Sequence, residues 1–236
     1  AVGVEFRFGA KVVGLARTRD RVSGVLLADG EEVSGDAVVL ATGHSARDVL
    51  RLLHREGIAV EAKAFAVGLR IEHPQALIDN IQYGRAAGHE KLGAASYHLA
   101  HSVEGRGVFS FCMCPGGWIV PAATEPGALV INGMSLSRRD SPFANSGLVV
   151  AVEPADVAAA GYAGPLGGLD FQQKIEQVAF AAGGGGLRAP ATRVTDFLAQ
   201  RASSTVGRAS YGPGVSAGDV GDVLDAGGIA LTSRLR

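Results

Sequence analysis

An apolar run that ends in glycine constrains the first part of this chain more than any other feature. Val38 to Leu40 follow Asp36, and the run closes on Ala41, Thr42 and Gly43. Such residues can be covered on both faces of a sheet, as in a buried parallel strand. Glycine has no side chain, so a ligand can approach its backbone. Because ligands of open α/β sheets bind at the carboxyl ends of strands, the pattern predicts a nucleotide-contacting strand; a generic buried strand and turn is the alternative.

Short strands are predicted ahead of this run. Residues Gly3 to Ala10 alternate between apolar and polar side chains, which indicates a strand. The segment Lys11 to Ala16 extends it or starts the next, and Val22 to Leu27 forms another. Between the apolar runs, Ala28-Asp29-Gly30 predicts a hairpin turn. The start of the chain therefore reads as a β-meander that leads into the Ala-Thr-Gly strand.

This arrangement resembles the FAD/NAD(P)-binding flavoproteins of the glutathione-reductase type, in which a β-meander precedes a strand that ends in Ala-Thr-Gly beside bound FAD. The resemblance implies a partial FAD-binding, Rossmann-like domain over residues 1–64. It also implies FAD contacts at Ala41, Thr42 and Gly43, and, through backbone near the adenine side, at Val12 and Val13.

The later part of the chain is similar to an uncharacterised family of bacterial FAD-dependent dehydrogenases. The segments that carry the similarity occur in the family's order: Phe109–Pro121, Ala122–Glu125, Asn132–Ser135 with Arg138 and Arg139, Asn145–Val150, Thr195–Leu198 and Ser210–Gly214. The resemblance implies a substrate, or cap, domain over residues 65–236, with a mixed or antiparallel sheet. The expected fold class is therefore α/β (α+β).

Such a flavoprotein opens with Gly-x-Gly-x-x-Gly, where the pyrophosphate meets a helix N-terminus, and this motif does not occur here. The chain also stops at Arg236, before the late segment that contacts the flavin in these proteins. Both features predict a fragment of a longer enzyme, whose expected partner is the remainder of the same polypeptide. The fragment alone is expected to be inactive.

Composition narrows the class of protein. The 236 residues are 47% hydrophobic and 19% charged, which suits a folded globular chain. A formal net charge of −1 gives no electrostatic case for binding nucleic acid. No apolar run is long enough to span a membrane, and no signal peptide is visible. A cytoplasmic location is therefore the expectation.

Periodicity and turn residues predict the remaining elements. Helices are expected over about 46–56, from His73-Pro74 through Ile81, over Leu169–Ala182 and over Val194–Ala199, with Ser45 as the cap of the first and Gly183–Gly186 as the stop of the third. Strands are expected at Ala66–Glu72, Ser96–Val103, Val108–Cys114, Trp118–Pro121, Ala128–Asn132 and Gly147–Glu153.

Two cysteines are the first candidates for chemistry. On a strand, Cys112, Cys114 and Ser110 point to the same face. The Cα atoms of Cys112 and Cys114 would lie about 6.5 Å apart, which is poor for a disulfide. Two thiols are also fewer than the four ligands that a structural zinc site needs. No metal is therefore expected. One interpretation is a thiol that faces flavin or substrate; the other is two small buried side chains.

Three other groups invite a functional reading, each with a structural alternative. In the tight Cys114–Gly117 turn, the backbone of Gly116 and Gly117 can approach the flavin ring, or the turn is a plain hairpin. On a predicted strand, Tyr97 and His101 share one face and His98 lies on the other. The two histidines are candidate proton carriers, or else surface or satisfied core histidines. The remaining group is polar (Asn132, Ser135, Arg138 and Arg139) and suits a substrate anion or the cofactor pyrophosphate, or forms a salt-bridged loop.

The function predicted from the sequence is an FAD-dependent oxidoreductase of unknown substrate, with NAD(P)H as a possible electron donor. Its catalytic residue is unassigned, with Cys112, Cys114 and His101 as candidates. The alternatives are a non-catalytic module of flavoprotein fold that binds a nucleotide or a partner, and a simple NAD-binding domain, against which the mixed sheet after residue 65 argues.

Overall fold

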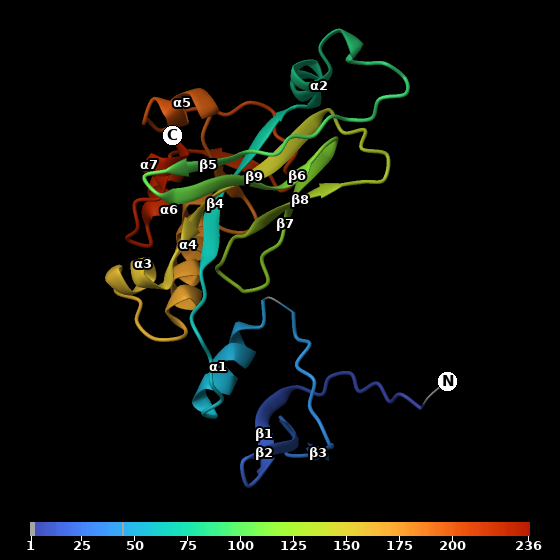
Figure 1. Cartoon of the computed structure of the whole chain (residues 1–236), viewed down its shortest axis with the longest axis vertical. Coiled ribbons are helices and arrows are strands. Elements are labelled where there is room, and N and C mark those ends of the chain that lie inside the picture. Colours follow the sequence, from blue (N-terminus) through green and yellow to red (C-terminus); the bar gives the residue numbers. More distant parts are fainter. Residues whose placement is uncertain (1–2, 44) are drawn as a thin grey trace. The chain divides into compact units, whose positions relative to one another are not determined.

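The chain divides into two compact units, residues 1–61 and 62–236, in a computed structural model that describes residues 3–43 and 45–236 (Figure 1). Both units mix helices with antiparallel strands. This bears out the mixed α/β class with antiparallel sheets. The assignment of residues 1–64 to a partial Rossmann-like FAD domain and of 65–236 to a substrate domain stays a prediction.

The first unit is built around a three-stranded antiparallel sheet. Its strands are β1 (Val12–Thr18), β2 (Arg21–Leu27) and β3 (Glu32–Ser34), in the order β1-β2-β3. The predicted Asp-Gly turn is present, because the Glu31 amide donates to Asp29 Oδ1 over 3.0 Å and Gly30 adopts a φ of 91°. The meander is therefore confirmed.

The strands predicted on either side of the meander are absent. Residues 3–10 and 37–43 form no strand, and their apolar side chains are exposed, with Phe8 at 94% and Val39 at 85%. Apolar alternation predicts a strand only where another strand supplies the ladder of hydrogen bonds. Within the described ranges no strand pairs with either segment. The residues predicted as the end of a buried strand therefore lie on extended, uncovered chain.

The helix predicted over about 46–56 is confirmed as α1 (Arg47–Arg55), which buries Leu52. Its cap is not Ser45: the N-cap residue is Ala46, and no side-chain hydrogen bond caps the helix. Gly57 follows the helix with a φ of 72°, a conformation that glycine adopts at low cost.

A four-stranded antiparallel sheet in the order β4-β9-β6-β5 forms the centre of the second unit (Figure 1). Its strands are β4 (Phe65–Pro74), β5 (Ala100–Val103), β6 (Arg106–Cys114) and β9 (Phe143–Val152). Strand β9 is central and pairs along its whole length with β4. The predicted strand over 96–103 forms only from Ala100, so Tyr97 lies outside it.

Helices cover one face of this sheet. They are α3 (Pro154–Ala159), α4 (Gly167–Gly183), α5 (Val194–Leu198), α6 (Val220–Asp225) and α7 (Thr232–Leu235). The core beneath them joins Val150 and Val152 of β9 to Phe171 of α4, with all three side chains fully buried. The helical spacing of Phe171 and Ile175 therefore predicted both the helix and its inward face correctly.

A hairpin and a smaller parallel pair complete the second unit. The hairpin consists of β7 (Gly117–Pro121) and β8 (Ile131–Ser135), and β10 (Ala189–Ala191) pairs in parallel with β11 (Val215–Ala217). The strand predicted over 128–132 thus begins three residues later. Beyond β4 lie α2 (Gln75–Tyr83) and a short 3₁₀ turn, η1 (Gly84–Ala86).

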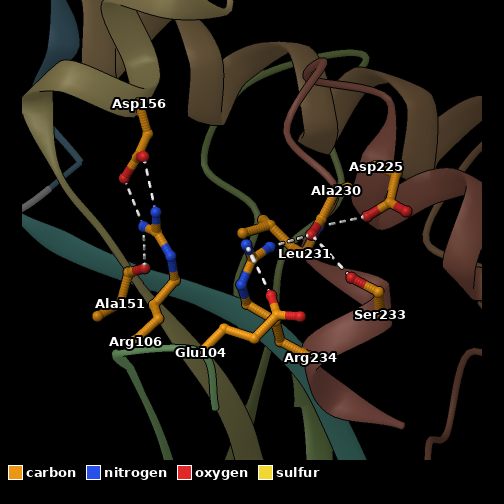
Figure 2. Close-up of polar contacts among 9 residues, drawn as sticks. All are labelled: Glu104, Arg106, Ala151, Asp156, Asp225, Ala230, Leu231, Ser233 and Arg234. Carbon is orange, nitrogen blue, oxygen red and sulfur yellow. Dashed lines mark hydrogen bonds and ion pairs between the residues drawn. The ribbon is translucent and has the colours of Figure 1, made fainter. Parts of the chain in front are cut away.

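Ion pairs fasten the helical layer to the ends of the strands (Figure 2). Arg106, at the start of β6, makes two hydrogen bonds to the Asp156 carboxylate, one of them 2.7 Å long, and donates to the Ala151 carbonyl over 3.0 Å. Asp156 also accepts from the Glu153 amide and so completes the capping box of α3. Arg234 of α7 lies 3.5 Å from the Glu104 carboxylate (Figure 2). The two ion pairs therefore connect α3 and α7 to the β5–β6 end of the sheet.

Candidate functional site

Polar side chains are buried in the middle of the central sheet, where apolar residues are expected. Asn145 and Ser146 of β9 are fully buried, and Ser110 of β6 is nearly so. Successive residues of a strand point to opposite faces. Asn145 therefore faces away from the helical layer, on the same side as Arg70 and Glu72 of β4, because Glu72 pairs directly with it.

A β-bulge places the two cysteines in different environments. The register between β6 and β9 shifts between Phe111 and Cys114, and Cys112 adopts a φ of 47°. The regular alternation that would align Cys112, Cys114 and Ser110 is broken there, so the prediction of a common face is wrong. Cys112 is exposed, whereas Cys114 is buried and pairs with Asn145.

Arg70 is held at this bulge by three neutral oxygen atoms. Its Nη1 donates to Asn145 Oδ1 over 2.6 Å and to the Cys112 carbonyl over 3.4 Å, and its Nη2 donates to Asn132 Oδ1 over 3.3 Å. These residues come from β4, β9, β6 and the β7–β8 hairpin. We call Arg70, Asn145, Asn132 and the bulge residues Cys112 and Cys114 the Arg70 cluster.

Gly133 of β8 closes the Arg70 cluster on the hairpin side. A Cβ atom at this position would overlap Arg70 Nη1 and Asn145 Oδ1 and would lie 2.7 Å from Cys114 Sγ. Only glycine therefore lets the hairpin pack this closely over the guanidinium. The Asn132 side chain also accepts a hydrogen bond from the Gly133 amide over 2.8 Å, which orients its carbonyl oxygen.

Burial keeps the thiol of Cys114 protonated. Removal from water raises the pKa of the Cys114 thiol, and the nearby Arg70 offsets this only in part. The thiol donates to the Cys112 carbonyl over 3.3 Å. Cys114 is therefore a neutral neighbour of the guanidinium.

A histidine and a tyrosine form a second polar pair, close to the carboxyl end of β4. His73 Nε2 lies 2.9 Å from the Tyr97 hydroxyl, and the two rings meet edge to face. Burial lowers the pKa of His73 and raises the pKa of Tyr97. Both groups are therefore uncharged near neutral pH, and their hydrogen bond joins two neutral side chains.

A cleft of about 350 Å³ lies beside α2. Its walls include Asp79 and Tyr83 of α2, His89 and Glu90 of the following loop, and Arg139. Asp79 Oδ1 already accepts from Gln75 Nε2 over 2.7 Å and from the Ala95 amide over 2.8 Å. Part of the polar lining thus fixes the loop in place.

The residues predicted to contact FAD in the first unit present open backbone. Val12 and Val13 are partly exposed at the start of the edge strand β1, and Ala41, Thr42 and Gly43 are exposed. A Cβ at Gly43, which has a φ of 77°, would meet no atom within 4 Å. These residues fit the close approach of a cofactor, and their contact with FAD stays a prediction.

The two glycines predicted to approach the flavin in the second unit are packed against protein. The Gly116 amide donates to Gln75 Oε1 over 2.6 Å, and a Cβ there would overlap the Arg139 carbonyl. Gly117 is buried against Met134 and Cys114. Flavin contact through Gly116 and Gly117 stays a prediction that these contacts do not support.

The remaining candidates do not gather at one place. His101 is exposed on β5, and Ser135 donates to the Pro115 carbonyl over 2.7 Å. Of the group Asn132, Ser135, Arg138 and Arg139, only Asn132 touches the Arg70 cluster, and Arg139 lines the cleft instead. The sequence analysis did not identify Arg70, Asn145, His73 or the His73–Tyr97 pair as site residues. The sequence signal for Arg70 is a single charge inside the otherwise apolar run Ala66–Ile71.

Within residues 3–43 and 45–236, every helix is too short or too polar to span a bilayer. In the same part of the chain, no three His, Cys, Asp or Glu side chains gather closely enough to bind a metal ion.

Known proteins resemble this chain over most of its length. An uncharacterized protein of Clostridium beijerinckii is 45% identical over 208 residues, which make up 87% of this chain and 38% of that relative. The chain thus spans well under half the length of the relative it matches. Residues 64–231, nearly the whole second unit, match the family described as FAD-dependent protein, C-terminal domain-like. On that match, the chain belongs to this family of FAD-dependent proteins.

Proposed function

We propose that this chain is part of an FAD-dependent oxidoreductase, with the second unit as its substrate domain. The observation that carries the proposal is the family match over residues 64–231. FAD supplies hydride transfer when it is bound, and the protein supplies placement and electrostatics. The proposal includes oxidoreductase activity on a substrate still to be identified, with NAD(P)H as the electron donor.

In the first unit, open backbone carries the proposed FAD contacts. Thr42 and Gly43 are exposed, and no neighbouring side chain fills the space beside Gly43. Val12 and Val13 lie on the outer strand of the meander. Main-chain groups at these positions are free to approach the cofactor without displacing packed side chains.

In the second unit, the proposed roles divide between charge and proton transfer. Arg70 places a fixed positive charge at the bulge, while His73 and Tyr97 form a half-buried pair of neutral, hydrogen-bonded side chains. A neutral histidine with a lowered pKa is suited to accept a proton near neutral pH. Cys112, Cys114 and His101 stay candidates for catalysis, with Cys112 as the accessible thiol.

The test uses the full-length protein. We expect it to purify with yellow flavin absorbance that dithionite bleaches, and to release FAD when it is denatured. Thr42→Glu places a bulky anion at the proposed cofactor contact and is expected to lower the FAD content. Thr205→Glu, at another exposed threonine, is the matched control.

Three outcomes are informative. A colourless protein that takes up no added FAD would contradict the proposal. Protein that binds FAD but is bleached by dithionite and by no biological reductant, NADH and NADPH included, would point to the non-catalytic alternative. Equal FAD content in the two threonine variants would remove Thr42 from the cofactor site.

A further inference from the structure

Within residues 3–43 and 45–236, the guanidinium of Arg70 has N–H donors without a protein acceptor. An arginine side chain carries five N–H donors in a planar fork. The two on Nη1 face Asn145 Oδ1 and the Cys112 carbonyl, and one on Nη2 faces Asn132 Oδ1. This leaves Nε–H, which lies on the same side of the guanidinium as Nη2, and one N–H of Nη2. They form the edge that accepts a carboxylate or a phosphate through two parallel hydrogen bonds.

Comparable arginines of this chain have carboxylate partners. The side chains of Arg106 and Arg234 are each 21% exposed, and they pair with Asp156 and Glu104 (Figure 2). Arg70 is also half-buried, but in the described part of the chain its partners are neutral groups, namely three oxygen atoms and the Cys114 thiol. Its charge is therefore uncompensated, and removing a charge from water without a partner is costly.

The acidic and thiol groups nearest to Arg70 do not supply the missing negative charge. Glu72, two residues along the same strand, accepts hydrogen bonds from the amide and the hydroxyl of Ser210, the former over 2.9 Å. Burial raises the pKa of the Cys114 thiol, which is consequently neutral. The cluster thus keeps a net positive charge.

A second, independent observation points to an acceptor that the protein does not provide. Asn145 Nδ2 is buried and has no hydrogen-bond partner among the described residues, although Oδ1 of the same amide accepts from Arg70. A buried amide left without an acceptor is costly, so such groups call for an explanation. By contrast, Arg70 Nε has no partner but is not among the buried atoms, so solvent or a ligand can reach it.

We propose that Arg70 binds an oxyanion, a carboxylate or a phosphate group of a small molecule, through Nε–H and the unused N–H of Nη2. Asn145 and Asn132 orient the guanidinium. The group has two possible sources, a substrate and the pyrophosphate of FAD. This site goes beyond the proposed redox function and does not require it.

The experiment compares full-length wild-type protein with Arg70→Met, Arg70→Lys and a control, Arg85→Met. Arg85 is exposed on η1 and has no polar partner among the described residues. The probes are inorganic phosphate and acetate, added at constant ionic strength with chloride as the balancing anion. Binding is measured by calorimetry and by the rise in Tm. A third titration measures the affinity of the apoprotein for FAD.

We expect at least one probe to bind wild type and Arg85→Met alike, and Arg70→Met to lose about tenfold or more in affinity, as the loss of a charge-assisted pair implies. Arg70→Lys keeps the charge but loses the planar fork of donors, so its affinity for the probe should also fall. If Arg70→Met does not fold, Arg70→Lys takes its place. Unchanged FAD affinity with lost probe binding assigns the site to a substrate. A parallel loss of FAD affinity assigns it to the pyrophosphate.

The proposal is overturned if neither the probes nor FAD bind differently to the Arg70 variants and to Arg85→Met. It is also overturned if chloride alone gives the same rise in Tm. Flavin absorbance, which tests the proposed function, does not depend on these probes. Either conclusion can therefore fail while the other stands.

Discussion

Arg70 Nη1 and Asn145 Oδ1, which are 75 residues apart in the sequence, are joined by a 2.6 Å hydrogen bond on the face of the central sheet that the helices leave uncovered. The bond links the edge strand β4 to the central strand β9. It gives Asn145 Oδ1 a donor, whereas Asn145 Nδ2 has no acceptor among the described residues. Substitutions at and around this hydrogen bond therefore test the proposed site.

Asn145→Asp is expected to supply the carboxylate that Arg70 lacks. The new side chain has almost the same shape, and its charge would pair with the guanidinium only 2.6 Å away. We expect the rise in Tm caused by phosphate or acetate to disappear, because the internal carboxylate competes for the same charge. Calorimetric titration checks this, and undiminished probe binding would contradict it. Asn80→Asp, at an exposed asparagine of α2, controls for the added negative charge.

Gly133→Ala is expected to destabilise the second unit. The added methyl group would overlap Arg70 Nη1 and Asn145 Oδ1, so the hairpin must move away from the sheet. Overpacking of this kind costs about 1–3 kcal/mol. Gly207→Ala is the matched control, because a Cβ there meets no atom within 4 Å. Thermal unfolding of both variants gives the comparison; equal Tm values would show that the hairpin does not pack as described.

Native alkylation is expected to modify Cys112 and spare Cys114. Cys112 is exposed at the bulge, whereas Cys114 is buried and its pKa is raised by burial. Thiolates are the reactive species, so a buried thiol reacts slowly. Brief treatment with iodoacetamide followed by peptide mass spectrometry should find one labelled thiol, and two after denaturation. Cys112→Ser should abolish the native label; label on Cys114 in that variant would be inconsistent with the bulge.

Much of the second unit follows from sequence periodicity. The alternation of Ala66–Glu72 and the helical spacing of Leu169–Ala182 predict β4 and α4, since each element has one face toward the core. The bulge at Cys112 is different. It depends on how β6 pairs with β9, and no local pattern records that register.

The candidate site was harder to predict for the same reason. A single arginine in an apolar strand resembles a solvent-facing residue until the hairpin that carries Asn132 and Gly133 is placed above it. Conversely, the apolar residues of 3–10 and 37–43 predict strands, but the described residues offer these segments no partner strand. Both failures concern contacts between segments far apart in the chain.

Acid is expected to destabilise the protein through His73. Burial lowers the pKa of His73 from its ordinary 6.5, so the unfolded chain takes up a proton at a higher pH than the folded chain. The unfolded state then binds more protons, and the free energy of unfolding falls as the pH drops below about 6.5 toward the folded pKa. We expect His73→Gln to remove this part of the pH dependence. Tm measured on both sides of that pH tests it, and His101→Gln, an exposed histidine, should behave as wild type.

The Arg106–Asp156 pair predicts a second, more acidic transition. Arg106 holds the pKa of Asp156 below its ordinary 3.8, so the stability it confers is complete above that value and is lost as the pH falls through the folded pKa. Asp156→Asn should cost about 1–3 kcal/mol at neutral pH, and the deficit should shrink in acid. Urea unfolding at both pH values measures it. A deficit that persists undiminished at the lowest pH would show that packing, and not charge, is responsible.

The charge of Arg70 depends on Ser210, because Ser210 holds the Glu72 carboxylate by hydrogen bonds. Ser210 lies 138 residues after Glu72 in the sequence. Were that late segment cut away or pulled aside, the released carboxylate would be free to swing toward Arg70 and neutralise it. The segment around Ser210, which has little regular structure, would therefore determine whether the Arg70 cluster stays positively charged.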